Sequence, residues 1–106
     1  MRSTQDKKEI PEVTNIAMNP PGVLVDNARV RVLSAHIPAG DKAPMHSHPD
    51  HVVYVLNGGV VKLTYPSGKE DTMELGSGKA IYMEAQSHEV TNLSDKDIDM
   101  VVIELK

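Results

Sequence analysis

The stretch that decides the fold is Met45-His46-Ser47-His48-Pro49-Asp50-His51, followed directly by Val52-Val53-Tyr54-Val55-Leu56. Three of the five histidines of the chain fall within these six positions, 46 to 51. Side chains alternate between the two faces of an extended segment, so His46 and His48 are expected to point the same way. Imidazole is the commonest metal-ligating side chain, and two such rings can reach one ion. Pro49 bends the chain and lets His51 return from a neighbouring direction. For a His-x-His pair alone, a polar loop with chance histidines is the competing interpretation.

Outward from this stretch, the sequence predicts short strands and no helix. Apolar and polar residues alternate with period two, and turn residues interrupt them every 8–12 residues or so, which is typical of an antiparallel sandwich or barrel. Asn57-Gly58 predicts a two-residue hairpin turn, because both residues tolerate positive φ. The predicted strands are 29–37, 52–56, 60–65, 70–75, 79–83, 89–92 and 99–105.

The composition fits a single β domain. The chain has 106 residues and is 40% hydrophobic, with no Phe and no Trp, so a core must come from many small branched side chains. Residues 1–21 start with a charged, weakly patterned segment, and the turn signal Asn19-Pro20-Pro21-Gly22 closes it. This pattern predicts a flexible N-terminal arm over residues 1–21 before a domain spanning residues 22–106.

Charge and cysteine content exclude several classes of protein. The net charge of −4, without a basic run, disfavours nucleic-acid binding. The absence of cysteine excludes disulfides, thiolate metal sites and cysteine nucleophiles. No apolar run is long enough to span a membrane, and the N-terminus lacks a signal-peptide pattern, so we expect a cytoplasmic protein without a membrane partner.

Arg31 and His36 lie in the predicted strand 29–37. The face that carries Leu33 and Ile37 is the more apolar, so it is expected to point inward and would aim Arg31 at the interior. A buried guanidinium needs a carboxylate or another anion. The alternative is an Arg31 at the rim of the barrel. His36 falls on the polar face and is expected at the surface.

Two motifs give the chain its family resemblance. Gly40, five residues, His46-x-His48 and then Gly58 resemble the first motif of the cupin superfamily, and His88 with Asn92 four positions later resembles its second motif. Counting back from Gly58 places His51 where the family has a glutamate. Met83 and Ala85 replace the proline and glycine of the second motif. The resemblance covers residues 29–105.

The resemblance implies an all-β jelly-roll (double-stranded β-helix) barrel with a divalent metal inside it. Its ligands would be His46, His48 and His88, with His51 as a fourth, as in all-histidine cupins. Four imidazole nitrogens suit Fe, Ni, Mn, Zn or Cu, and ligand type alone does not choose among them. Metal affinity is expected to fall below roughly pH 6, because the ordinary imidazole pKa is about 6.5.

The resemblance also implies several functions. The leading one is a metal-dependent dioxygenase or related oxidoreductase acting on a small organic substrate, with Arg31, Tyr54 and Tyr82 as possible substrate contacts; the other interpretation of both tyrosines is structural. One alternative is a non-catalytic binding or sensing cupin with a structural metal, and another is a metal-free isomerase with a histidine base. Cupins of this size commonly pair, and the apolar Val30/Val32 face would serve a homodimer.

Overall fold

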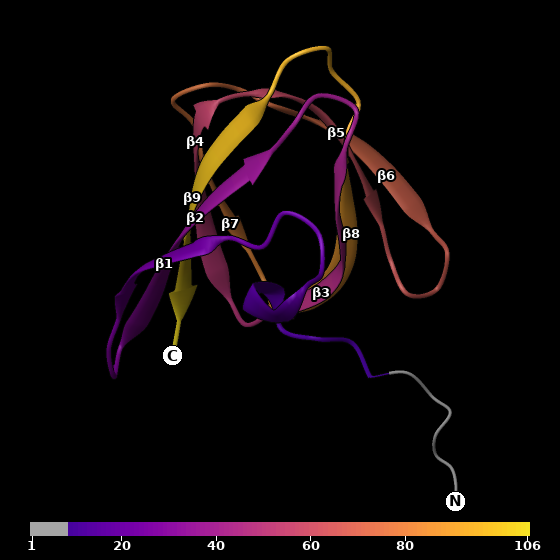
Figure 1. Ribbon diagram of the computed structural model, residues 1–106. Helices are drawn as coiled ribbons and strands as arrows, with labels where there is room; N and C mark the ends of the chain where they lie inside the picture. The colour runs from indigo at the N-terminus through magenta and orange to yellow at the C-terminus, as the bar shows by residue number, and fades with distance from the viewer. Residues whose placement is uncertain (1–8) are drawn as a thin grey trace, which may run out of the picture.

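The computed structural model describes residues 9–106, and Met1–Lys8, the start of the predicted arm, lie outside the described residues. One 3₁₀ turn and nine strands follow one another along residues 9–106 (Figure 1). Their bounds are η1 Val13–Asn15, β1 Gly22–Asp26, β2 Val30–Ile37, β3 Lys42–His48, β4 His51–Asn57, β5 Gly59–Thr64, β6 Glu70–Leu75, β7 Ala80–Met83, β8 Gln86–Asn92 and β9 Ile98–Leu105.

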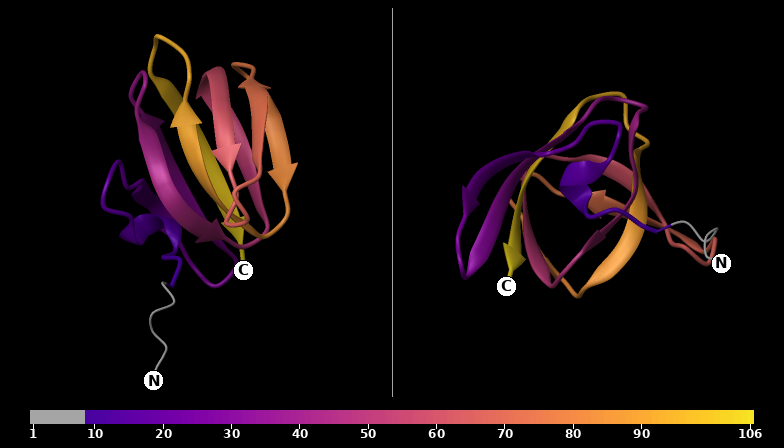
Figure 2. Two further views of the ribbon diagram at one scale, coloured as in Figure 1. Left: turned by 90° about the vertical axis from the view of Figure 1, so that its right-hand side faces the viewer. Right: turned by 60° about the horizontal axis from the view of Figure 1, so that its bottom comes forward.

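The strands form two antiparallel sheets that face each other. One sheet has the order β1-β2-β9-β4-β7 and the other the order β3-β8-β5-β6. The two views of Figure 2 show the sheets curving around a shared interior, with β1 and β2 extending beyond it on one side. The predicted all-β jelly-roll fold is confirmed. No helix among residues 9–106 is long and apolar enough to cross a membrane.

The core lies between the two sheets and follows the period of two. In β9, Ile98, Met100 and Val102 are buried while the residues between them are partly exposed. Leu33 and Ile37 of β2 are buried as well, so the predicted inward face of this strand is confirmed. The buried apolar residues are mainly Val, Ile and Leu, as the composition requires for a chain without Phe or Trp.

The predicted hairpin at Asn57-Gly58 is wrong. β4 pairs with β7 and β9, whereas β5 pairs with β6 and β8, so the chain crosses here from one sheet to the other. Gly58 does not have a positive φ. A Cβ at this position would collide with the backbone carbonyl of Leu75, so glycine is required for close approach rather than for a turn.

The described part of the predicted arm, residues 9–21, lies against the barrel. Val13 and Ile16 are buried in the core, and the amide of Ser47 in β3 donates to the carbonyl of Pro11 at 2.9 Å. The right-hand view of Figure 2 shows η1 across one end of the barrel. This segment therefore closes the cavity described below, which the weak apolar pattern of the sequence did not indicate.

Candidate metal centre

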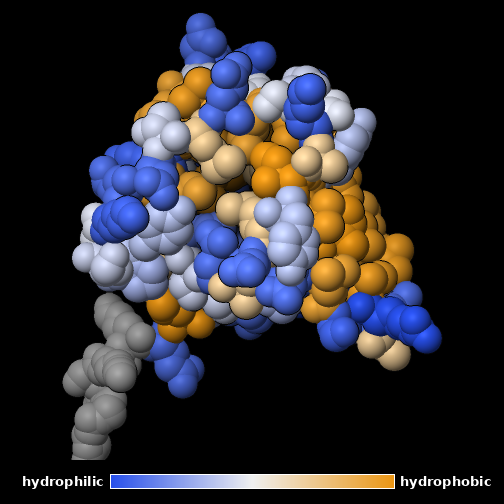
Figure 3. Space-filling model, turned by 180° about the vertical axis from the view of Figure 1, so that it is seen from behind, coloured by the Kyte–Doolittle hydropathy of each residue, from blue (hydrophilic) through white to orange (hydrophobic). Residues whose placement is uncertain are grey.

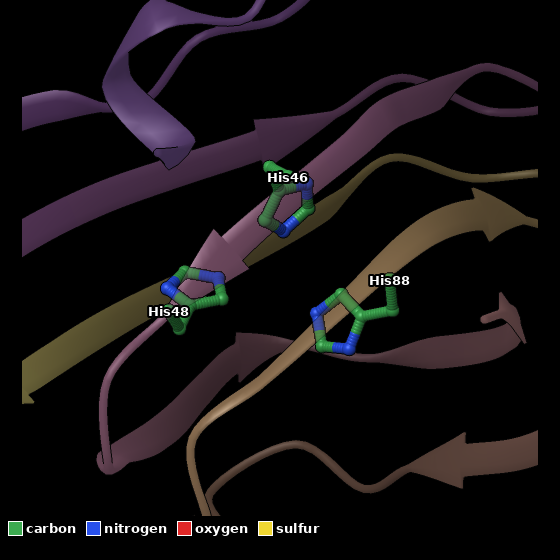
Figure 4. Close-up of side chains that lie close together, drawn as sticks. All are labelled: His46, His48 and His88. Carbon is green, nitrogen blue, oxygen red and sulfur yellow. The ribbon is translucent and has the colours of Figure 1, made fainter. Parts of the chain in front are cut away.

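Three buried histidines meet on the inner face of the second sheet. His46 and His48 share a face of β3, and His46 stands directly opposite His88 of β8 in the strand register. The ring centroid of His46 lies 4.8 Å from that of His48 and 4.9 Å from that of His88. A ring nitrogen from each of the three lies within 4.8 Å of the others (Figure 4). The histidines are thus positioned to hold a metal ion.

His51 reaches the same cavity from the opposite sheet. The chain turns at Pro49-Asp50, so β3 ends at His48 in one sheet and β4 begins at His51 in the other. The His51 ring is 1% exposed and stacks on the His48 ring, with centroids 4.4 Å apart and 27° between the planes. His51 is not a member of the group whose ligand atoms lie within 4.8 Å of one another, so its role as fourth ligand stays a prediction.

The Nδ1 atom of each of these four rings faces a hydrogen-bond acceptor. His46 Nδ1 lies 2.7 Å from the Pro44 carbonyl, and His51 Nδ1 lies 2.7 Å from the Pro49 carbonyl. His48 Nδ1 lies 2.7 Å from Glu104 Oε2, and His88 Nδ1 lies 2.9 Å from Gln86 Oε1. A carbonyl or carboxylate oxygen only accepts, so each Nδ1 donates its proton. The lone pair of each ring is thereby left on Nε2, as ligation through that atom requires.

Burial lowers the pKa of three of these imidazoles, those of His46, His48 and His88. Desolvation lowers the pKa of His46, and it lowers the pKa of His88 to about 3, with smaller contributions from the neighbouring histidines. The pKa of His48 is lowered to about 3, again mainly by desolvation. A metal ion competes with protons for imidazole, so a depressed pKa favours the ligating form.

Glu104 is the buried residue of the site that the sequence argument missed. It is 3% exposed, and it binds His48 through Oε2 and Arg31 through Oε1. The alternation of Ile98, Met100, Val102 and Glu104 in β9 was the signal that could have found it, because the fourth member must point inward with the other three.

Arg31 meets carboxylates, as a guanidinium near the interior requires. Its Nε donates to Glu104 Oε1 at 2.9 Å, and its Nη2 donates to Glu12 Oε1 at 2.6 Å. The predicted surface position of His36 holds, since its side chain is half exposed and pairs with Asp99 on the outer face.

The histidines line a small apolar cavity of about 70 Å³ between the sheets. Neither Arg31, Tyr54 nor Tyr82 is among its lining residues, and the tyrosines are 41% and 57% exposed. Tyr82 instead lines a groove on the surface near β6, β7 and β8. This groove shares four wall residues with the cavity: Leu63, Met73, Ile81 and Met83.

The chain resembles known proteins in sequence and in structure. The cupin domain model, Cupin_2, matches residues 33–104. The crystal structure of a cupin domain from Bordetella pertussis is 32% identical, with a TM-score of 0.75 over 93% of this chain and 98% of that one. No curated protein matches the chain.

More distant structures show the fold alone. A protein with a double-stranded β-helix domain from Klebsiella pneumoniae is 18% identical, with a TM-score of 0.65 over 80% of this chain and 76% of that one. The DMSP lyase DddQ from Ruegeria pomeroyi is 17% identical, with a TM-score of 0.63 over 81% of this chain and 46% of that one.

Proposed function

Since this chain belongs to the cupin family, we propose that it binds one divalent transition metal through Nε2 of His46, His48 and His88, with His51 as the fourth ligand. The observation that carries the proposal is the common orientation of the rings, whose Nδ1 atoms all face acceptors. Neutral imidazoles suit Fe, Ni, Mn, Zn or Cu, and their number does not select one of them.

The activity proposed is that of a metal-dependent oxidoreductase, a dioxygenase, acting on a small organic substrate. The bound metal would supply Lewis acidity and redox chemistry with O₂. The chain itself would supply a dry apolar wall, and the only other polar residue lining the cavity in the described chain is Asn19. A dioxygenase adds both atoms of O₂ to its substrate and needs no separate reductant, which fits a cavity without further acid–base groups.

The groove beside β6 and β7 supports an entry route for the substrate. It shares walls with the cavity, and its rim carries the carboxylates of Asp71 and Glu84 and no Lys or Arg. A carboxylate rim disfavours anionic molecules. We therefore expect a substrate that is not an anion.

The alternative is a non-catalytic binding or sensing protein with a structural metal. The small size of the cavity favours it, and so would a coordination sphere filled by four histidines. Azide added to the Co(II)-loaded protein separates the two: a change in the visible spectrum indicates an exchangeable position, whereas an unchanged spectrum indicates a closed structural site.

The activity is tested by oxygen uptake of the Fe(II)-loaded protein against a panel of diketones and phenols. His88→Ala should abolish both metal and uptake, while His36→Ala, at the exposed fifth histidine, should leave both unchanged. No uptake with any substrate by wild-type protein that holds Fe(II) would count against the oxidoreductase and for the non-catalytic alternative.

We also propose a second copy of the chain as a partner, at the outer face of the five-stranded sheet. An apolar row crosses all five strands in register: Val25, Val32, Ile103, Val52 and Tyr82. Apolar side chains gather on this side of the molecule (Figure 3). Because the row holds no charge, two copies can pack face to face without burying one. Five strands at about 4.8 Å spacing make a face ~24 Å wide. Cytoplasmic location stays a prediction from the sequence.

A further inference from the structure

Glu104 joins two parts of the molecule that are far apart in the sequence. In the sheet register it stands opposite Arg31 of β2 on one side and opposite His51 of β4 on the other. Its two carboxylate oxygens have different partners. Oε1 accepts from Arg31, at 2.9 Å from Nε and 2.8 Å from Nη2, and Oε2 accepts from His48 Nδ1 at 2.7 Å.

We propose that Glu104 is a positioning residue for the metal centre: with its Oε1 held by Arg31, its Oε2 fixes the orientation and tautomer of the His48 ring, so that Nε2 carries the lone pair. This role rests on the proposed metal binding for its purpose, but the orientation of the ring can be measured without metal.

The Nδ1 proton of His48 depends on a side-chain acceptor, whereas those of His46 and His51 do not. His46 and His51 donate to backbone carbonyls two residues before them, and such acceptors cannot become donors. His48 donates to a side chain instead, so the tautomer of this ring depends on what occupies position 104.

Arg31 determines which atom of the side chain at position 104 faces His48. A guanidinium has five donors and no acceptor. In Glu104→Gln the Arg31 side chain would keep the single amide oxygen, and the amide NH₂ would face His48 Nδ1. That nitrogen would then accept, and the proton would move to Nε2, the atom that is proposed to bind the metal. Replacing one carboxylate oxygen by an amide nitrogen at position 104 should therefore move the ring proton of His48 from Nδ1 to Nε2.

The contacts extend to the segment that closes the cavity. Arg31 Nη2 also binds Glu12 Oε1 at 2.6 Å, and Glu12 precedes η1, whose Val13 lines the cavity. A series of hydrogen bonds, Glu12–Arg31–Glu104–His48, thus connects the segment that closes the cavity with one of the proposed ligand rings.

The first experiment is long-range ¹H–¹⁵N NMR of the imidazoles in metal-free, full-length protein. We expect His48 as the Nδ1–H tautomer in the wild type and as the Nε2–H tautomer in Glu104→Gln. Asp99→Asn is the matched control, because Asp99 also lies in β9 and binds a histidine Nδ1, that of His36, on the outer face. It should leave His48 unchanged. An Nε2–H tautomer in the wild type, or an unchanged one in Glu104→Gln, overturns the proposal.

The second experiment measures Co(II) affinity by competition with a chelator and records the visible spectrum. Glu104→Gln should weaken Co(II) binding about 10–100-fold, the usual effect of losing such a support, and shift the spectrum. Adding Arg31→Met to Glu104→Gln frees the amide to rotate and should recover part of the affinity. Equal affinity in Glu104→Gln and the wild type overturns the positioning role.

The two proposals can fail separately. If the wild type shows the expected tautomer and its inversion but binds no Co(II), the metal proposal fails while the role of Glu104 in orienting His48 stands. If Co(II) binds and the tautomer does not respond, the positioning role fails alone.

Discussion

His46 and His88 face each other directly across the β3–β8 pair, with ring centroids 4.9 Å apart. Opposed residues of an antiparallel pair have Cβ atoms about 4.5–5.5 Å apart, which is a suitable spacing for two rings to share one ion. A third ring follows two positions along β3, at His48. The three-histidine group is therefore a consequence of strand register, and loop conformation contributes little to it.

Replacing a ring of this group should remove the ion. We expect His88→Ala protein, expressed in defined medium, to contain much less than one metal per chain by elemental analysis, because only His46 and His48 of the close three-histidine group then remain, with His51 in the other sheet. His36→Ala is the control and should keep the wild-type content, since His36 lies on the outer face. Equal metal content in the two variants would place the site elsewhere.

His51→Ala tests the fourth ligand. The variant should keep the ion but bind it more weakly, by about tenfold or more, because the other three rings remain together in one sheet. Competition titration with a chelator measures the change. An affinity equal to that of the wild type would show that His51 packs on His48 without ligating.

The pKa shifts predict acid lability of the metal-free protein. The pKa of His88 is about 3 in the folded chain and about 6.5 when unfolded, so between these values the unfolded state binds the extra proton and stability falls as pH falls. From pH 7 to pH 5 this one group should cost roughly 2 kcal/mol. Urea unfolding at both pH values measures it, and His88→Gln should show a smaller loss.

The same shifts change an expectation from the sequence. Ordinary imidazoles would release metal below roughly pH 6, but burial lowers the pKa of His46, His48 and His88. We expect the folded protein to retain its ion down to lower pH, and release to coincide with unfolding. Parallel measurement of bound metal and circular dichroism checks this; release at pH 6 from fully folded protein would contradict it.

Ile16→Ala tests the closing segment. Ile16 is buried against the core, and removing such a side chain typically costs 2–5 kcal/mol. Chemical denaturation should show a loss of this order. Ile10→Ala, at an exposed isoleucine of the same segment, should cost little. Similarly small losses of stability for both variants would support the predicted flexible arm over residues 9–21 and contradict their packing against the barrel.

Ile103→Glu tests the proposed dimer. Ile103 lies in the middle of the apolar row on the outer sheet face, and a buried charge facing its own copy should prevent pairing. Light scattering should give twice the 11.6 kDa chain mass for the wild type and one chain mass for the variant. Val60→Glu, in the other sheet, should remain dimeric. A monomeric wild type would exclude the dimer.

The sequence predicted seven of the nine strands from local alternation, but it missed β1 and β3, where prolines, glycines and histidines interrupt the apolar pattern. Alternation predicted the inward face of β2, and the resemblance to the two cupin motifs implied that His88 joins His46 and His48, which the strand register places together. It could not predict that Asn57-Gly58 crosses between the sheets, because the same dipeptide suits a hairpin, and the carbonyl of Leu75 that requires glycine there is distant in sequence.

The ion-pair partners of Arg31 could not be predicted from local sequence patterns either. Arg31 needed an anion, but only the register between β2 and β9 identifies Glu104, and only the placement of residues 9–21 adds Glu12. Tyr54 points outward because it alternates with the buried Val53 and Val55 of β4, and Tyr82 is exposed between the partly buried Ile81 and Met83 of β7.

The turn at Pro49-Asp50 separates His48 and His51 into opposite layers of the molecule. An ion held by both would cross-link the two sheets at one end of the barrel, as a disulfide does in other small domains, and this chain has no cysteine with which to form one. Loading with metal should then slow the separation of the layers, and His51→Ala should remove that kinetic protection while the ion stays bound to a single sheet.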